Sequence, residues 1–189
     1  MKPKPKKCKI CGEKFSPFQS TVKVCSPKCA LSLVRSVAKK KEAVAQKEVR
    51  KDTSRRREAL KTISDWKKEV KDVFNKFIRL RDTLAGHGCI SCGTKDPSLQ
   101  YAAGHYRSVG ACAELRFCEE NVHLQCNRRC NKELSGNLIE YRINLVKRIG
   151  IEKVEWLESK HEPKRYRIED LKELKIIYRD KIKILEGKI

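Results

Sequence analysis

The sequence predicts an α+β protein in which two zinc-stapled parts lie among long helices. Eight of the ten cysteines fall into close pairs, in two groups of four, and this is the spacing of zinc ligands. Apolar residues recur at helical spacing over several long segments. Hydrophobic residues make up only 39% of the chain, with five Phe. We therefore expect zinc, and not apolar burial alone, to hold the small compact parts together.

The first predicted element is a separate N-terminal zinc module over residues 1–32. Its four ligands come in two pairs separated by thirteen residues: Cys8 and Cys11, then Cys25 and Cys29. Each pair can form a tight knuckle whose thiolates point at one ion, and Gly12 suits the left-handed turn of such a knuckle. Four thiolates leave no open coordination position, so this zinc is predicted to be structural. Whether the module binds DNA or another protein stays open.

A basic segment follows at residues 33–58. The whole chain carries 45 Lys and Arg against 24 Asp and Glu, a net charge of +21, so nucleic acid is the first partner to consider. Helix is permitted here, but apolar positions are sparse, which indicates a solvated, mobile segment. It is either a charged linker or an arm that contacts DNA phosphates. The candidate DNA-binding residues are Lys39, Lys40, Lys41, Arg55, Arg56 and Arg57.

Residues 59–86 are predicted to form an amphipathic helix that Gly86 and Gly88 end. Its apolar stripe contains Leu60, Ile63, Trp66, Val70, Val73, Phe77, Leu80 and Leu84. This stripe suits either the core of the subunit or the interface of a homodimer, and the sequence does not choose between them.

The third part, residues 87–150, contains a second four-cysteine set. Its predicted ligands are Cys89, Cys92, Cys126 and Cys130. The 33 residues between the pairs leave room for a hairpin, which would carry His105, Asn121 and His123. Cys112 and Cys118 are left over and are interpreted as small buried residues, although either could replace a knuckle cysteine.

Two further helical segments are predicted after the cysteines. The first carries Leu138, Tyr141, Leu145 and Ile149 and stops at Gly150. The second lies in the C-terminal region, residues 151–189, after a break at Pro163, and its apolar positions are Ile168, Leu171, Leu174, Ile177, Tyr178 and Leu185.

Membrane and secreted classes are disfavoured. No apolar run is long enough to span a bilayer, and the basic residues are not confined to one amphipathic helix. The N-terminus MKPKPKKC lacks the apolar region of a signal peptide. Metal-ligand spacing in place of disulfides indicates a reducing compartment, so we expect a cytoplasmic protein.

The runs AAGHYRSVGA and ELRFCEENVHLQCNRRCNKELSGN resemble the NinG (Rap) family of phage recombination proteins. More broadly, knuckles that bracket a His, an Asn and a final Cys-Asn are similar to zinc-containing HNH nucleases. The resemblance implies a small ββα-metal nuclease core that cleaves branched DNA, such as Holliday junctions and D-loops, with Mg²⁺ or a substituting Mn²⁺. A phage origin would place the protein in the host cytoplasm, with other phage recombination proteins as further partners.

Carried over by motif position, the resemblance makes His105 the general base and Asn131 the ligand of the catalytic metal. Asn121 takes the middle position, where its side chain would pin the loop that carries His105. Phosphodiester hydrolysis requires these residue types, since imidazole can deprotonate water near neutral pH. A cation beside the scissile phosphate stabilises the developing charge, and Mg²⁺ prefers oxygen ligands.

Two departures from the HNH pattern concern the metal. Gly104 stands where many of these enzymes have an Asp ligand, and the last knuckle has three intervening residues instead of two. His123 is a tentative second metal ligand or a phosphate contact, with a structural role as the alternative. Nearby arginines that could clamp phosphate are Arg107, Arg128 and Arg129. Arg116 is also close to the site in sequence, but for it the interpretation as a solvated charge remains.

A non-catalytic zinc protein that binds DNA or scaffolds recombination partners fits the zinc sites and the charge equally well. Only the His105, Asn121 and Asn131 set favours the nuclease, because binding alone needs no base beside a metal-ligating amide.

Overall fold

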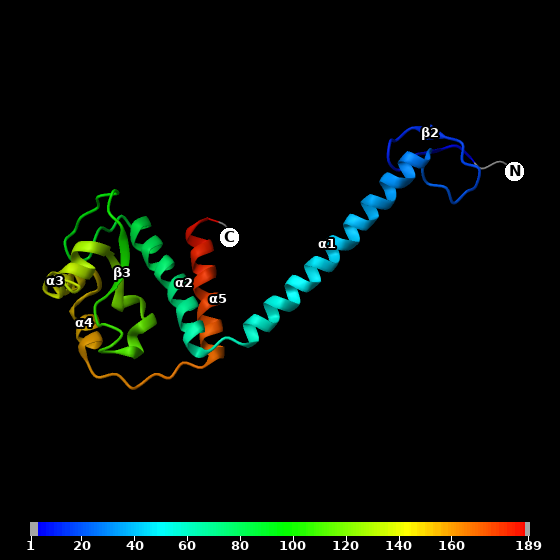
Figure 1. The fold of residues 1–189 in the computed structure, drawn as a ribbon. Coiled ribbons are helices and arrows are strands. Elements are labelled where there is room, and N and C mark those ends of the chain that lie inside the picture. The colour runs from blue at the N-terminus through cyan, green and yellow to red at the C-terminus, as the bar shows by residue number, and fades with distance from the viewer. Residues whose placement is uncertain (1–3, 188–189) are drawn as a thin grey trace. The chain divides into compact units, whose positions relative to one another are not determined.

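The computed structural model describes residues 4–187, which form helices and two small sheets (Figure 1). The ends of the first and last predicted segments, residues 1–3 and 188–189, lie outside the described residues. The chain divides into two compact units, Met1–Leu60 and Lys61–Ile189. Within residues 4–187, no helix combines the length and the apolar character that a membrane span requires.

The first unit consists of the cysteine module and one long helix. Strands β1 (Lys6–Lys7) and β2 (Lys14–Phe15) pair antiparallel. Helix α1 (Pro27–Ala59) begins inside the module, because the hydroxyl of Ser26 accepts a hydrogen bond from the backbone N–H of Cys29 at 3.3 Å. Helix α1 therefore contains both the last residues of the expected module and the whole of the expected basic segment.

Helix α1 takes the helical form that its composition permitted, and its side chains are solvated as expected. It runs for 33 residues without a buried side chain, so tertiary packing does not hold it. Ion pairs one turn apart support it instead, from Lys51 to Glu48 and from both Arg55 and Arg56 to Asp52. The absence of Gly and Pro allows the helix to continue.

The second unit is built on helix α2 (Ile63–Leu84), which packs against α5 (Ile168–Leu185). Thr62 and Asp65 form a capping box at its start, and Gly86 follows its end with φ +69°. Of the predicted stripe, Trp66, Val70 and Phe77 are buried in the core, and Val73 and Leu80 pack partly buried against it, whereas Ile63 and Leu84 are exposed. Phe74 and Ile78, which the prediction did not include, are also buried there, beside Leu171, Tyr178 and Ile182. Leu60 caps α1 instead of entering α2 and is 82% exposed. A dimer through the whole stripe is therefore not available.

A two-stranded antiparallel hairpin lies next to α2. Strand β3 (Tyr101–His105) pairs with β4 (Val122–Cys126), with His105 opposite Val122. The short helical turns η1 (Ala113–Phe117) and η2 (Glu119–Asn121) connect the strands. A seven-residue π-helical segment, η3 (Asn127–Glu133), follows β4 directly. Asn121 thus ends η2 and does not share a strand with His123.

Two short helices complete the unit on a second core. Helices α3 (Leu138–Ile149) and α4 (Ile151–Glu158) meet at Gly150, whose φ of +87° suits glycine. Their buried residues pack with Ile90, Cys112 and Leu115. The Tyr141 hydroxyl donates a hydrogen bond to the carbonyl oxygen of Gly104 at 2.9 Å, which ties this core to the hairpin.

Candidate metal centres and active-site cleft

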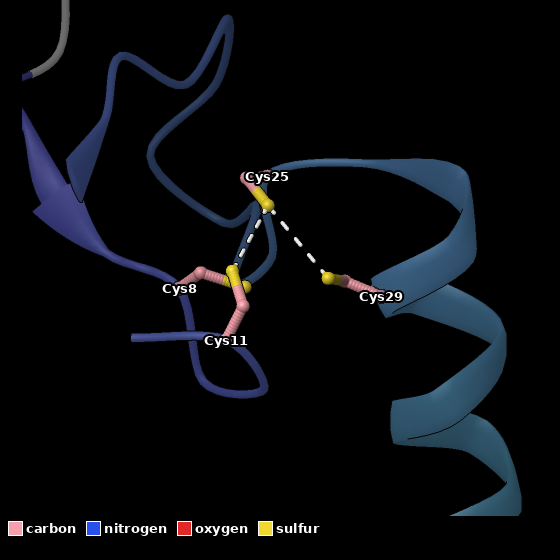
Figure 2. Close-up of side chains that lie close together, drawn as sticks. All are labelled: Cys8, Cys11, Cys25 and Cys29. Atoms are coloured by element: carbon pink, nitrogen blue, oxygen red, sulfur yellow. Dashed lines mark hydrogen bonds between the residues drawn. The ribbon is translucent and has the colours of Figure 1, made fainter. Parts of the chain in front are cut away.

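Four cysteine sulfurs converge in the first unit (Figure 2). The Sγ atoms of Cys8, Cys11, Cys25 and Cys29 all lie within 4.8 Å of one another. The distance is 3.4 Å from Cys11 to Cys25 and 3.7 Å from Cys25 to Cys29. A tetrahedral zinc with Zn–S bonds of ~2.3 Å has S–S edges of about 3.8 Å, whereas a disulfide is ~2.05 Å long. This cluster can therefore hold a zinc ion.

The second cluster joins three segments of the second unit. Cys89 and Cys92 come from the loop after α2, Cys126 ends β4, and Cys130 lies in η3. The Sγ atom of Cys126 is 3.7 Å from that of Cys89 and 3.9 Å from that of Cys92. The backbone N–H groups of Cys126 and Cys130 donate to the sulfurs of Cys89 and Cys126 at 3.3 and 3.4 Å. Such donors stabilise thiolates, so this cluster can also hold zinc.

The two clusters repeat the same knuckle. The backbone N–H of Gly12 donates to the Cys8 carbonyl at 3.1 Å, and that of Gly93 donates to the Cys89 carbonyl at 2.8 Å. Both glycines have positive φ, +79° and +74°, so the left-handed turn expected at Gly12 is confirmed. Cys112 and Cys118 belong to neither cluster, and Cys112 is buried in the second core.

A cleft of about 620 Å³ lies in the second unit and brings His105 and Asn131 together. Its walls come from α2, β3, the loop after β3, η1, η3 and the turn before α3. Asn131 reaches it because Cys130, the preceding residue, lies in the second cysteine cluster. The charged residues of the lining are all basic: Lys71, Arg107 and Arg116.

The His105 ring is anchored at one nitrogen. Its Nε2 lies 3.0 Å from the carbonyl oxygen of Arg116. A carbonyl can only accept, so Nε2 carries the proton and Nδ1 keeps a lone pair. Burial lowers the pKa of His105, and the positive charges of Arg116 and Lys71 lower it further, against the opposing effect of the Arg116 carbonyl. A neutral imidazole with a free Nδ1 is able to take a proton from water.

Asn121 fixes the chain immediately after His105. Its Oδ1 accepts from the Arg107 N–H at 2.8 Å, and its Nδ2 donates to the Arg107 carbonyl at 3.0 Å. A further bond runs from Nδ2 to the Leu115 carbonyl at 3.2 Å. Asn121 is fully buried, so it acts on the loop and on η1 through these bonds.

The structure explains the glycine at position 104. A Cβ atom there would lie only 3.0 Å from the Cβ and Cδ atoms of Gln125 on β4, and would overlap its Oε1. An aspartate at this position would therefore require Gln125 to move. Position 104 therefore supplies no carboxylate ligand to the cation that the family resemblance implies.

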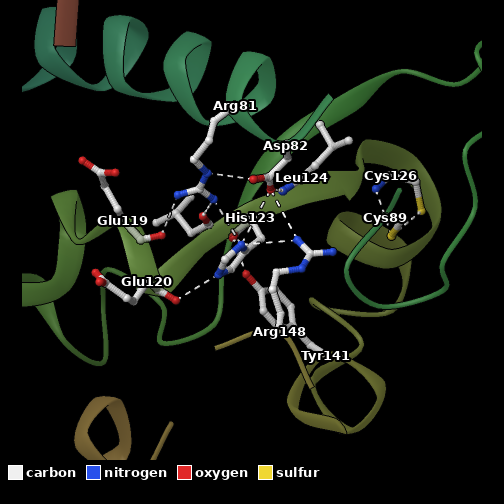
Figure 3. Close-up of polar contacts among 12 residues, drawn as sticks. Arg81, Asp82, Cys89, Glu119, Glu120, His123, Leu124, Cys126, Tyr141 and Arg148 are labelled. Atoms are coloured by element: carbon white, nitrogen blue, oxygen red, sulfur yellow. Dashed lines mark hydrogen bonds and ion pairs between the residues drawn. The ribbon is translucent and has the colours of Figure 1, made fainter. Parts of the chain in front are cut away.

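His123 lies in a buried network and not in the cleft lining (Figure 3). Its Nε2 is 3.0 Å from the Glu120 carbonyl, so Nε2 donates and Nδ1 accepts from Arg81 Nη2 at 3.1 Å. Burial lowers the pKa of His123, against the opposing effect of Asp82, whose Oδ2 lies 3.6 Å from Nδ1, and this favours the neutral ring. Both ring nitrogens are thus engaged within the protein. These contacts favour the structural role of His123 over the role of a metal ligand.

Asp82 is the acidic centre of the same network. Burial alone would raise its pKa, but hydrogen bonds and the charge of Arg81 outweigh burial and hold the pKa far below its usual range. Its carboxylate accepts from Arg81 at 2.7 Å and from the Leu124 N–H at 2.7 Å, with Arg148 at 3.5 Å. This network ties the end of α2 to β4 and therefore steadies the hairpin.

The predicted arginines have different surroundings. Arg107 lines the cleft, and its Nη1 also donates to the Glu158 carbonyl at 3.0 Å. Arg128 and Arg129 lie beside the second cysteine cluster, away from the cleft lining, and Arg128 pairs with Glu133 at 2.9 Å. All six basic candidates of α1 are exposed.

Three residues of the cleft lay outside the predicted site. Lys71 and Asn75 sit one turn apart on α2, and Arg116 follows on η1. Arg116 was interpreted as a solvated charge, yet its carbonyl orients His105. No sequence motif contains Lys71 or Asn75, and no local pattern in the sequence singled them out.

The oxygen donors of the cleft suit a hard cation that is held in part by substrate. Asn131 offers an amide oxygen, and the Oδ1 atom of Asn75 is buried without a hydrogen-bond partner among the described residues. Mg²⁺ keeps several of its waters and needs few protein ligands. The residues present therefore fit such a cation, and Asn131 would be one of its ligands.

Comparison with known proteins identifies the family. The family model described as "Bacteriophage Lambda NinG protein" matches residues 1–188. The chain belongs to the NinG family of bacteriophage proteins.

Relatives named "Protein ninG" from Escherichia phage 933W, Escherichia phage lambda and Enterobacteria phage H19B are 40%, 40% and 41% identical to the chain. Each alignment covers 98% of this chain and 96% of the relative. The motif runs by themselves suggest the lambda protein, but at 40% identity this NinG chain is a homologue of it and not the same protein. No solved structure matches the chain significantly.

Proposed function

We propose that this NinG protein is a Mg²⁺-dependent, structure-specific DNA endonuclease that cleaves branched recombination intermediates such as four-way junctions and D-loops. The observation that carries the proposal is that His105 and Asn131 line one cleft whose charged residues are all basic. This set combines a neutral base, an oxygen ligand for a cation and positive charge for a phosphate.

The hydrolysis follows from the orientation of His105. Nδ1 takes a proton from a water molecule while the water oxygen attacks phosphorus, and the bond from phosphorus to the 3′ oxygen breaks. The departing oxygen takes a proton from solvent, which leaves a 3′-hydroxyl and a 5′-phosphate, and the imidazolium then returns its proton to water. Magnesium bound at Asn131 would supply Lewis-acid stabilisation of the charge that develops on the phosphate oxygens.

The basic residues hold the phosphate in place. Lys71, Arg107 and Arg116 give the cleft a positive potential that attracts the DNA backbone. Asn121 keeps the loop after His105 in position through the Arg107 backbone. The two cysteine clusters would hold structural zinc, the second of which orients Asn131 through Cys130.

Branched DNA as the substrate rests on the family resemblance, while the charge of +21 supports nucleic acid in general. The rival is a zinc protein that binds the same DNA without cutting it. The two differ only in what the cleft residues do, so the test compares binding with cleavage.

The experiment incubates the purified protein with a labelled four-way junction, with and without Mg²⁺. Cleavage should require the cation, and His105→Ala should lower the rate by ~10²–10⁴-fold with little change in junction affinity. Asn131→Ala should also inactivate, and higher Mg²⁺ should restore part of its activity but none of the activity of His105→Ala.

His161→Ala serves as the matched control, because His161 lies outside the cleft lining. Its rate should equal that of the parent protein. Tight junction binding by the parent without any cleavage would favour the non-catalytic alternative. Cleavage by His105→Ala at the parent rate would place the activity elsewhere.

A further inference from the structure

Asn75 lies on a wall of the cleft that is distant in sequence from the motif residues. It belongs to α2, one helical turn after Lys71, and both side chains line the cleft with His105 and Asn131. The Oδ1 atom of Asn75 is buried and has no hydrogen-bond partner among residues 4–187. Only one other buried side-chain oxygen of the described residues, Oε1 of Gln125, is in this state.

An unpartnered buried amide oxygen weakens the folded state, because the atom loses water without gaining another donor. A leucine of similar size would remove that penalty at this position. The amide is therefore a poor choice for packing, and its oxygen suits a group that enters the cleft. An oxygen can accept hydrogen bonds or coordinate a cation, but it cannot donate to a phosphate.

The remainder of the cleft indicates which group this is. None of the residues that line the cleft is acidic, and its three charged side chains, Lys71, Arg107 and Arg116, are basic. A divalent cation must then rely on neutral oxygens of the protein and on the phosphate itself. Gly104 contributes no ligand, so Asn131 alone leaves the protein side of the site with one amide oxygen.

We propose that Asn75 supplies a second oxygen to the cation of the cleft, in addition to that of Asn131, either directly or through one cation-bound water. This inference rests on the proposed nuclease function and adds to it a residue from outside the motif. Two neutral amides in a basic cleft attract a free cation weakly, so the site should fill only when DNA phosphate is present.

The test measures cation binding without cleavage. In a His105→Ala background, Mn²⁺ is titrated into the complex with a four-way junction and into the junction alone, and bound Mn²⁺ is followed by electron paramagnetic resonance. The difference gives the ions held by the protein–DNA site. Adding Asn75→Leu should weaken this binding by about 10–100-fold, the usual effect of removing a group around a metal.

Three further measurements separate a role of Asn75 in cation binding from a role in folding. Thermal unfolding of Asn75→Leu should occur at the same temperature as the parent or higher, since a buried amide without a partner is removed. Asn144→Leu makes the same substitution at an amide that bonds to the Ser91 carbonyl outside the cleft, and it should leave Mn²⁺ binding unchanged. Asn75→Asp should let Mn²⁺ bind even without DNA, because it adds a carboxylate.

The outcomes are distinct. Equal Mn²⁺ binding with and without Asn75→Leu, while the parent still cuts junctions, overturns the role of Asn75 and leaves the nuclease intact. A parent protein that neither cuts nor holds Mn²⁺ beyond the junction alone overturns both. Loss of Mn²⁺ binding with an unchanged or raised unfolding temperature supports the assignment.

Discussion

Gly104 on β3 and Gln125 on β4 lie diagonally across the hairpin, and the side chain of Gln125 occupies the space that a side chain at position 104 would need. Gln125 is held there by its Nε2, which donates to the Ser91 hydroxyl at 2.7 Å and to the Gly136 carbonyl at 2.6 Å. Gly104 is thus coupled through Gln125 to the loop of the second cysteine cluster and to the turn before α3.

Gly104→Ala should destabilise the protein by ~1–3 kcal/mol, the usual cost of forcing an extra methyl into a packed site. Urea denaturation measures this change. Gly110→Ala is the matched control, because its Cβ would have no heavy atom within 4 Å, and it should have little effect. Combining Gly104→Ala with Gln125→Ala should cost less than the sum of the single changes, and strict additivity would contradict the coupling.

The protein should contain two zinc ions per chain, and native mass spectrometry counts them. Because the clusters belong to different units, Cys11→Ser should lose one ion and leave the second unit folded. Cys126→Ser should lose the other ion and unfold the hairpin, since metal binding and folding are coupled. Disulfides between the paired cysteines, with no zinc, would refute both assignments.

The pH dependence of cleavage should reflect the lowered pKa of His105. Burial disfavours the imidazolium, so the neutral base persists to lower pH than an unperturbed histidine, whose pKa is ~6.5. The rate at low substrate should therefore fall on the acid side with a midpoint below that value. In His105→Ala this fall should disappear, and activity should rise toward high pH where hydroxide is present. A midpoint above ~6.5 would disagree with the burial of the ring.

Helix α1 should contribute affinity without shape preference. Replacing Lys39, Lys40, Lys41, Arg55, Arg56 and Arg57 with Gln should weaken binding to linear and branched DNA alike. The slope of log affinity against log salt should decrease by roughly 0.9 for each duplex phosphate that the helix no longer neutralises. His105→Ala should keep the parent slope, as it removes no full charge. Unchanged affinity would make the helix a spacer only.

The sequence by itself determined the features that depend on local spacing. The two knuckles follow from a pair of cysteines with two intervening residues and a glycine directly after the second cysteine, and both fold as expected. Amphipathic periodicity located α2, α3 and α5, because each must bury one apolar stripe. Motif position also predicted that His105 and Asn131 belong to one site, and both line the cleft. His105 ends strand β3 of the hairpin, and Asn131 follows Cys130 of the second cluster.

Only the tertiary structure decided which residues distant in sequence line the cleft together with His105 and Asn131. Lys71, Asn75 and Arg116 enter the cleft because α2 and η1 pack on the hairpin, and no local pattern encodes that approach. His123 has the residue type of a ligand, yet Arg81 and Glu120 engage both of its ring nitrogens. The continuity of α1 was also hidden, since its helix depends on capping by Ser26 and on exposed ion pairs, and not on an apolar stripe. Spacing in sequence reports contacts within one turn or knuckle, whereas a site made of several separate segments depends on how those segments pack.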